Sequence, residues 1–369
     1  MIYNCYLTCA LLPFLVSAIS GFIFTPQIIS FCLKRKLYDL PNERKVHHSA
    51  IPRLGGVAFL PCMLLAFLVA MLVLSSLTPG MPVKVGLWSC VFLISIFMIY
   101  VVGIVDDLVG LGARTKFVVQ IIAASLMPLS GLWVNDLYGL FGIYEIPFWV
   151  GAPITVFILV FIDNAMNLID GIDGLSAGLA LISLTGFLYC FAREGIWSYC
   201  VMVSGLMGVI TAYLYYNLFG KAEKKRKIFM GDSGSLTIGF ILGFLFIKFA
   251  MNNTAIMPYR SDSLLLAYTL LIVPCFDVVR VALTRIRKGT SIFHPDKNHI
   301  HHKLMRSGLS QHASLAVILL LALLFCLINV LLLKVTKITV IVISDVVIYI
   351  LFQLALNMII RHHGQKAIE

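Results

Sequence analysis

Long apolar runs separated by short polar segments make up most of this 369-residue chain. A helix that crosses a bilayer needs about 20 consecutive apolar residues. Eleven runs approach that length, near residues 6–31, 54–75, 86–105, 117–133, 147–163, 175–192, 198–216, 235–250, 263–283, 313–333 and 338–360. The pattern predicts an all-α polytopic integral membrane protein with about eleven transmembrane helices, in which residues 1–369 form a single transmembrane domain.

The composition leaves little room for a soluble domain. Hydrophobic residues make up 60% of the chain and charged residues only 12%, which is far from the balance of soluble proteins. Nucleic-acid-binding modules, dinucleotide-binding domains and secreted disulfide scaffolds are thereby excluded. The nine cysteines are scattered through apolar runs without metal-like spacing, so they are expected to be small buried hydrophobic residues.

The basic residues predict the orientation in the membrane. No basic residue precedes the first run, and Lys34, Arg35 and Lys36 follow it, so we expect the N-terminus outside and, after eleven helices, the C-terminus in the cytoplasm. Inside segments then hold 21 of the 28 Lys and Arg residues, outside segments 5, and all nine histidines lie inside or at an inside edge. The active site is therefore expected on the cytoplasmic face. The inside segments lie at about 32–53, 106–116, 164–174, 217–234, 284–312 and 361–369.

An acidic pair, Asp106 and Asp107, follows the third apolar run. Two adjacent carboxylates at a membrane boundary repel each other and require compensation. A divalent cation, Arg114 or Lys116 could supply it. The alternative is a solvated helix end without a function.

The fifth run leads into the segment FIDNAMNLIDGIDGLSAG. Residues three apart on a helix share a face, so Asn164, Asn167 and Asp170 are expected on one side. Asp173 joins them only if the helix breaks, and the two glycines of GIDG favour a break. The result would be a polar pocket for a sugar, a nucleobase or a metal-bound diphosphate.

The motif MGDSGS at 230–235 comes directly before the eighth run. Its glycines would let backbone N–H groups approach an anion at a helix start, while Asp232 supplies an oxygen ligand for Mg²⁺. A simple N-cap formed by Asp232 or Ser233 is the alternative.

A basic loop at 284–312 contains His299, His301, His302 and Arg306. Histidine clusters can bind Zn²⁺, but the surrounding Lys and Arg side chains favour a diphosphate or nucleotide phosphate. We therefore expect anion binding in preference to zinc. The preceding pair, Asp277 and Arg280, lies at i and i+3 and is interpreted as a structural ion pair.

The first inside segment is also basic and ends in Arg53 and the pair Gly55-Gly56. The glycines are expected to open space beside Arg53 for close approach of a ligand. For Lys34, Arg35 and Lys36 the alternative is simple contact with anionic lipid headgroups. Bases and Mg²⁺-type carboxylates on one face, without a soluble nucleotide domain, suit phosphoryl transfer.

Five motifs in this order resemble the signatures of the polyprenyl-phosphate N-acetylhexosamine-1-phosphate transferases. The resemblance covers almost the whole chain, and the first and last motifs look like the WecA and TagO branch, which transfers GlcNAc-1-phosphate from UDP-GlcNAc to undecaprenyl phosphate. The motifs are PNERKVH with PRLGG (41–47 and 52–56), DD (106–107), NAMNLIDGIDGL (164–175), MGDSGS (230–235) and HPDKNHIHHKL (294–304).

The resemblance implies an enzyme of the bacterial inner membrane that releases UMP and catalyses the first membrane step of cell-envelope polysaccharide synthesis. The donor would be UDP-GlcNAc or another UDP-N-acetylhexosamine, and the acceptor would be undecaprenyl phosphate. A homodimer is one possible assembly. Alternatives are phospho-N-acetylmuramoyl-pentapeptide transfer, as in the MraY branch, and a secondary transporter or flippase.

The residue patterns of the motifs and the resemblance together indicate the candidate site residues. We expect Asp106, as base or orienting group for the lipid phosphate, with Asp107, Asp170 and Asp173 as catalytic residues. Asp232, helped by Asp107 or Asp170, is expected to bind Mg²⁺ or, alternatively, Mn²⁺. The expected substrate-binding residues are Arg53, Asn164, Asn167, His299, His301, His302 and Arg306.

Overall fold

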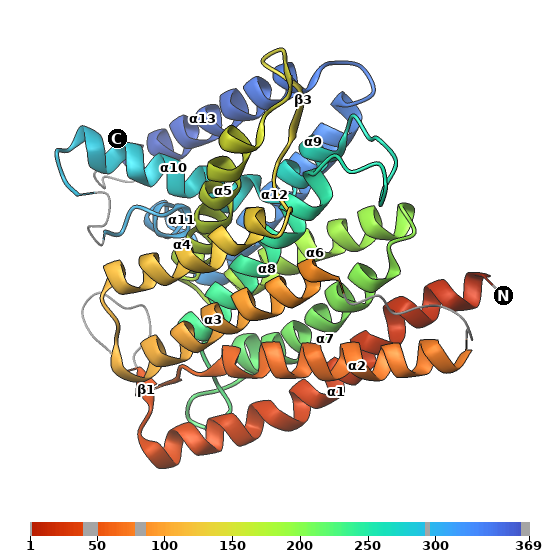
Figure 1. The fold of residues 1–369 in the computed structure, drawn as a ribbon. Coiled ribbons are helices and arrows are strands. Elements are labelled where there is room, and N and C mark those ends of the chain that lie inside the picture. The colour runs from red at the N-terminus through yellow and green to blue at the C-terminus, as the bar shows by residue number, and fades with distance from the viewer. Residues whose placement is uncertain (1, 40–50, 78–85, 292–295, 363–369) are drawn as a thin grey trace.

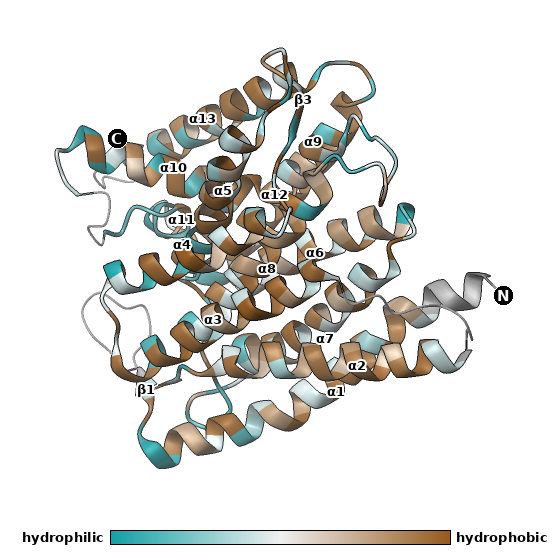
Figure 2. Ribbon diagram, viewed as in Figure 1, coloured by the Kyte–Doolittle hydropathy of each residue, from teal (hydrophilic) through white to brown (hydrophobic). Residues whose placement is uncertain are grey.

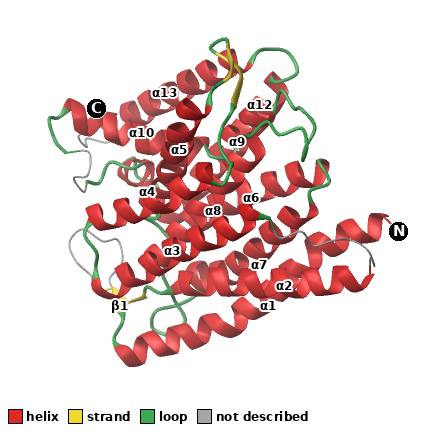
Figure 3. Cartoon of the chain, in the orientation of Figure 1, coloured by secondary structure: helices red, strands yellow, loops and turns green. Residues whose placement is uncertain are grey.

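Helices form nearly all of the structure, a computed structural model that describes residues 2–39, 51–77, 86–291 and 296–362 (Figures 1 and 3). The PNERKVH motif at 41–47 and His294 lie outside these ranges. The helices are α1 (Ile2–Arg35), α2 (Phe59–Leu77), α3 (Leu87–Val109), α4 (Ala113–Leu129), α5 (Phe148–Ile169), α6 (Leu175–Arg193), α7 (Trp197–Phe219), α8 (Asp232–Ala250), α9 (Ser263–Thr269), α10 (Ile272–Arg287), α11 (Ile300–Arg306), α12 (Gln311–Leu332) and α13 (Ile338–His362).

Two small antiparallel ladders and one 3-10 turn complete the fold. β1 (Tyr38–Asp39) pairs with β2 (Ile51–Pro52), and β3 (Asp136–Leu140) pairs with β4 (Ile143–Glu145). The 3-10 turn η1 (Gly55–Ala58) leads into α2. α1 begins on one side of the bundle and α13 ends on the opposite side (Figure 1).

The helical, multi-pass membrane architecture is confirmed, but the count of eleven spans is not. Among the described residues, nine helices are long and apolar enough to cross a membrane, and ten when α9 and α10 count as one bent span. α4 occupies the predicted run 117–133 but ends after 17 residues. In Figure 2 apolar residues dominate the helices, and hydrophilic residues gather at helix ends and in loops.

The prediction of one unbroken helix over 263–283 is wrong. α9 and α10 meet at a bend of 69°. Pro274 explains the break, because a proline has no N–H to donate and its ring excludes the carbonyl of the residue four positions earlier. That residue is Leu270, whose carbonyl instead accepts a 2.6 Å hydrogen bond from the Ser183 hydroxyl.

Two predicted inside segments begin within helices rather than after them. α3 continues to Val109 and therefore contains Asp106 and Asp107. α5 continues to Ile169, so Asn164 and Asn167 are helical residues. The polar residues at these helix ends are therefore positioned by helical backbone and not by a loop.

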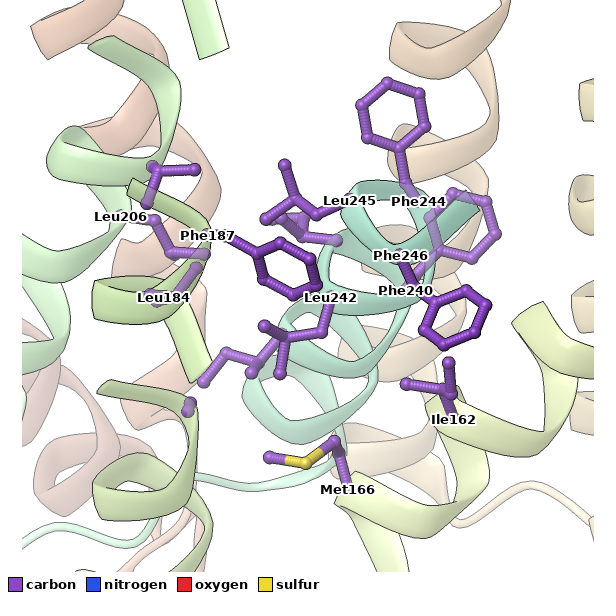
Figure 4. Close-up of a cluster of buried hydrophobic side chains, with 14 of the residues drawn as sticks. Ile162, Met166, Leu184, Phe187, Leu206, Phe240, Leu242, Phe244, Leu245 and Phe246 are labelled. Atoms are coloured by element: carbon purple, nitrogen blue, oxygen red, sulfur yellow. The ribbon is translucent and has the colours of Figure 1, made fainter. Parts of the chain in front are cut away.

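α8 occupies the centre of the bundle, and every residue from Ser233 to Ala250 is buried. Its large side chains pack among those of α5, α6 and α7, as Figure 4 shows for Phe240, Leu242 and Leu245. Glycines bring the neighbouring backbones close. A Cβ on Gly103 of α3 would lie 2.6 Å from the Ser233 Cα, and one on Gly239 would lie 2.7 Å from the Asp163 Cα.

The segment that precedes α2 is paired to the segment that precedes α8. The N–H groups of Gly55 and Gly56 donate to the carbonyls of Phe229 (2.9 Å) and Met230 (2.8 Å). A Cβ on Gly56 would lie 2.0 Å from the backbone of Gly234. The expectation that these glycines open space for a ligand is therefore wrong: the chain itself fills that space.

We predict that Gly56→Ala destabilises the protein, because the added methyl group would force two backbones apart at a cost of about 1–3 kcal/mol. Gly86→Ala is the matched control, since a Cβ at Gly86 would meet no described atom within 4 Å and the φ of this residue is negative. Thermal unfolding of both variants in the same detergent measures the effect. Equal Tm values for the two variants would contradict the packing argument.

Candidate active site

A cavity of about 850 Å³ lies at the end of the bundle where α3 and α5 end and α8 begins. Parts of all five sequence motifs line it. The predicted site residues on its wall are Arg53, Asp106, Asp107, Asn167, Asp170, Asp173, Asp232 and His302. Four predicted residues, Asn164, His299, His301 and Arg306, are not among the lining residues.

Asp107 holds the start of α8. One carboxylate oxygen accepts the N–H of Asp232 and the other accepts the N–H of Ser233, each at 2.9 Å. Gly231 precedes them with φ 73°, and a Cβ there would lie 2.1 Å from the Arg53 carbonyl. The MGDSGS backbone thus binds an anion, as predicted for a helix start, but the anion is Asp107. N-capping by Asp232 or Ser233 is not observed.

Lys116 of α4 joins two of the acidic motifs. Its Nζ lies 2.7 Å from Asp232 Oδ2 and 3.2 Å from Asp106 Oδ2. The other oxygen of Asp106 accepts the N–H of Leu111 at 2.6 Å. Of the two basic candidates, Lys116 therefore compensates Asp106, whereas Asp107 is compensated by the N–H groups of α8.

The chain breaks after α5, as the glycines of GIDG predicted. Asp170 is the C-cap of α5, and Gly174 starts α6 with φ 75°. Burial raises the pKa of Asp170 to about 8, and repulsion from Asp232 and Asp173 acts in the same direction. Asp170 therefore lies where negative charge is in excess, and a cation beside it would be favourable.

Asp173 has its own partners in the cavity. Lys227 Nζ lies 2.6 Å from Asp173 Oδ2. Asn217, at the end of α7, donates to Asp173 Oδ1 at 3.4 Å and to the Ile228 carbonyl at 2.9 Å, and it accepts the Gly174 N–H at 2.7 Å. Sequence reasoning missed both residues, because Lys227 belongs to a basic run that only indicated topology and Asn217 is a single amide at a helix end.

The two asparagines of α5 have different surroundings. Asn167 lines the cavity and donates to the Ser235 hydroxyl of α8 at 2.8 Å. Asn164 donates to Gln120 Oε1 at 3.0 Å, and Gln120 in turn donates to the buried carboxylate of Asp163 at 2.8 Å. The structure therefore places Asn164 in a contact between α4 and α5, behind the cavity wall.

The ion pair predicted between Asp277 and Arg280 is present, at 2.8 Å, and Asp277 is completely buried. Its carboxylate also accepts from His299 Nδ1 at 2.8 Å and from the Ile300 N–H at 3.0 Å. Asp277 thus anchors the start of α11 as well as compensating Arg280. His299 is held by this contact, away from the cavity.

The histidines of α11 occupy distinct positions. The ring of His301 is buried against Gly171, where a Cβ would lie 2.2 Å from Nε2, while His302 reaches the cavity. Burial lowers the pKa of His301 to about 3 and of His302 to about 4, so both rings are neutral near pH 7. Arg306 stabilises the loop by donating a hydrogen bond to the Lys297 carbonyl at 3.1 Å.

No group of three His, Cys, Asp or Glu side chains in the described part of the chain is placed to hold a metal ion by itself. The ring centroids of His301 and His302 lie 4.2 Å apart, and the basic residues around the loop disfavour a bare cation beside them. The loop is better suited to an anionic or polar ligand that reaches His302.

Fold and cavity together define a multi-pass helical membrane protein with an acidic cavity at the end of its bundle. Residues 89–250 match the family described as glycosyl transferase family 4. Across 85% of the chain and 82% of the relative, it is 32% identical to the probable undecaprenyl-phosphate N-acetylglucosaminyl 1-phosphate transferase of Bacillus subtilis. The chain therefore belongs to this family of membrane transferases.

Two further relatives agree. The undecaprenyl-phosphate α-N-acetylglucosaminyl 1-phosphate transferase of Escherichia coli is 30% identical over 85% of this chain and 82% of its own. The decaprenyl-phosphate N-acetylglucosaminephosphotransferase of Mycobacterium tuberculosis is 32% identical over 83% and 78%. Both names carry the sugar phosphate and the class of lipid that the motifs indicated.

We predict that Asp277→Ala lowers Tm by about 6 °C or more, because it leaves Arg280 buried without its partner, which typically costs about 3–5 kcal/mol. Asp262→Ala is the control, since Asp262 pairs with the more exposed Arg193 at 3.3 Å and such pairs contribute about 0–1 kcal/mol. Thermal unfolding monitored by intrinsic fluorescence compares the two. A smaller loss for Asp277→Ala than for Asp262→Ala would contradict the anchoring role.

Proposed function

We propose that this protein transfers N-acetylglucosamine 1-phosphate from UDP-N-acetylglucosamine to undecaprenyl phosphate and releases UMP. The observation that carries the proposal is the convergence of five aspartates with Arg53, Lys227 and His302 in one cavity of a membrane-embedded bundle. The names of the relatives support the same donor group and a polyprenyl-phosphate acceptor. They favour this activity over phospho-N-acetylmuramoyl-pentapeptide transfer and over transport.

In the proposed reaction an oxygen of the lipid phosphate attacks the phosphorus that carries the sugar. The bond from that phosphorus to the UMP oxygen breaks, and UMP leaves with the bonding electrons. A phosphate monoester is already largely ionised near pH 7, so Asp106 need not remove a proton and serves to orient the acceptor. Arg53 and the neutral ring of His302 provide hydrogen-bond donors for the donor phosphates or sugar.

The donor set of the cavity fits Mg²⁺, with Mn²⁺ as an alternative. Mg²⁺ in phosphoryl-transfer sites usually takes one or two carboxylates and completes its shell with water and substrate phosphates. Asp232 and Asp170 are the proposed ligands, since both line the cavity and Asp232 already attracts a cation, Lys116. When bound, the ion would neutralise charge on the diphosphate.

Asp107 takes a different role in the proposal. Both of its oxygens already accept backbone N–H groups of α8, so it is a positioning residue that fixes Asp232 rather than a direct metal ligand. Asp173 and Lys227 form an ion pair on a part of the cavity wall that these contacts do not include. We infer that this part of the wall contacts the nucleotide, because its ammonium and carboxylate can pair with the phosphate and the base respectively.

We further propose that the cavity faces the cytoplasm of a bacterial inner membrane, with the N-terminus outside. The asymmetry of 21 inside against 5 outside Lys and Arg residues supports this orientation. A water-soluble UDP-sugar would then reach the cavity from the cytoplasm, and the lipid phosphate would enter from the bilayer.

The enzyme assay uses purified protein, undecaprenyl phosphate, Mg²⁺ and a panel of UDP-GlcNAc, UDP-GalNAc and UDP-MurNAc-pentapeptide. We expect UMP release and a lipid-linked product with UDP-GlcNAc above all, and loss of activity in EDTA that Mg²⁺ or Mn²⁺ restores. Asp232→Asn should lose about 100-fold in kcat/KM, equivalent to about 2.7 kcal/mol, while Asp262→Asn should keep full activity.

Each failure has a separate meaning. Absence of any lipid-linked product would refute the transfer proposal. Full activity in excess EDTA would refute the metal proposal alone. Preference for UDP-MurNAc-pentapeptide would replace the proposed donor.

Orientation is tested by single cysteines in a cysteine-free background. Lys224→Cys, between α7 and α8, should react with a membrane-impermeant maleimide only after the cytoplasmic face is opened, whereas Thr254→Cys, between α8 and α9, should react in intact cells. Both positions are exposed. The reverse pattern would invert the proposed topology.

A further inference from the structure

A second buried polar cluster lies away from the cavity, between α9, α12 and α13. It consists of Asp345, Asn329, Thr269 and Tyr268. Asp345 is 0% exposed, Asn329 1% and Thr269 4%. Tyr268 and Thr269 end α9, directly before the bend into α10. None of the four residues belongs to a motif of the proposed active site.

The hydrogen bonds within this cluster are incomplete. Asn329 Nδ2 donates to Thr269 Oγ1 and to Asp345 Oδ2, both at 2.9 Å. The Tyr268 hydroxyl lies beside the same carboxylate. Yet Asp345 Oδ1, Asn329 Oδ1 and the Tyr268 hydroxyl are all buried and have no hydrogen-bond partner among the described residues. One carboxylate oxygen, one amide oxygen and a hydroxyl that lies close enough to interact with the carboxylate thus lack a well-formed hydrogen bond.

The charge of Asp345 is also uncompensated. Asp345 forms no ion pair with any described Lys, Arg or His side chain. The described side chains that interact with its carboxylate are those of Asn329 and Tyr268. An ionised carboxylate inside a helix bundle is costly unless a positive charge accompanies it. Asp277, the other completely buried aspartate of this region, has Arg280 for that purpose.

We infer that a small monovalent cation, Na⁺, binds between α9, α12 and α13 with Asp345 Oδ1, Asn329 Oδ1 and the Tyr268 hydroxyl as ligands. Uncharged oxygens and one carboxylate are ligands for a hard cation. A single carboxylate balances one positive charge, so a divalent ion would leave a net charge in the interior. Cation sites also form where a membrane helix is interrupted, as between α9 and α10.

A proton or a water molecule is the alternative occupant. A proton on Asp345 would neutralise the charge and could be donated to Asn329 Oδ1, but that bond joins only α12 and α13. A water molecule could bridge the oxygens, but it would leave the carboxylate charged. One cation does both, and it would hold the end of α9 against α12 and α13. The cation would thereby stabilise the bent span formed by α9 and α10, and α10 contains Asp277.

The experiment measures Tm of the purified protein in detergent while NaCl replaces choline chloride at constant ionic strength and pH. We expect Tm to rise by about 3 °C at saturating sodium. Asp345→Asn should abolish the dependence. Tyr268→Phe, which removes one ligand oxygen and keeps the ring, should shift the midpoint to at least about tenfold higher sodium. Asp262→Asn, at the outer end of α9, should respond as the wild type does.

A wild-type Tm that is the same in sodium and choline would overturn the inference. So would a sodium response that survives in Asp345→Asn. If Tm rises as the pH falls and ignores sodium, Asp345 is a protonated carboxylic acid and the cation site is wrong. Should Asp345→Asn fail to fold, an unchanged midpoint in Tyr268→Phe refutes the ligand set. The readout needs no transferase activity, so it is independent of the proposed function.

Discussion

The carboxylate of Asp107 accepts two backbone N–H groups at the start of α8, and the rest of the site depends on this contact. The N-terminus of a buried helix has unsatisfied N–H groups and a partial positive charge, and a carboxylate stabilises both. Because Asp107 belongs to α3, the contact also fixes α3 against α8. Gly103 makes it sterically feasible by letting the two backbones approach. Asp232 is the first residue of α8, so the contact with Asp107 also fixes the position of Asp232.

A second buried carboxylate organises the other wall. Asp277 joins Arg280, His299 and the backbone of α11, and Lys303 of α11 donates to Gln353 of α13 at 2.8 Å. His302 therefore reaches the cavity from a short helix that is tied to α10 on one side and α13 on the other. The rigid contacts lie behind the cavity, and the side chain that faces it remains available to a ligand.

The helical, multi-pass fold was predictable from the sequence, because the length of the apolar runs is a direct consequence of the bilayer. The break at GIDG was also predictable, since glycines in a polar helix end favour it. The bend between α9 and α10 was not identified, although Pro274 was its signal within an apolar run. Asp107 and Asn164 could not be assigned from spacing, because Ser233 and Gln120 are far away in the chain.

The complete burial of α8 has a consequence for how the protein is assembled in the membrane. A helix that is surrounded by protein needs little apolarity of its own, and α8 is less apolar than α12, most of which is not covered by protein. Its partition into lipid as an isolated segment is therefore weaker. α3, α5 and α6 precede it in the chain and supply most of its contacts. The order of synthesis thus provides the surroundings that this central helix requires before it has to enter the bilayer.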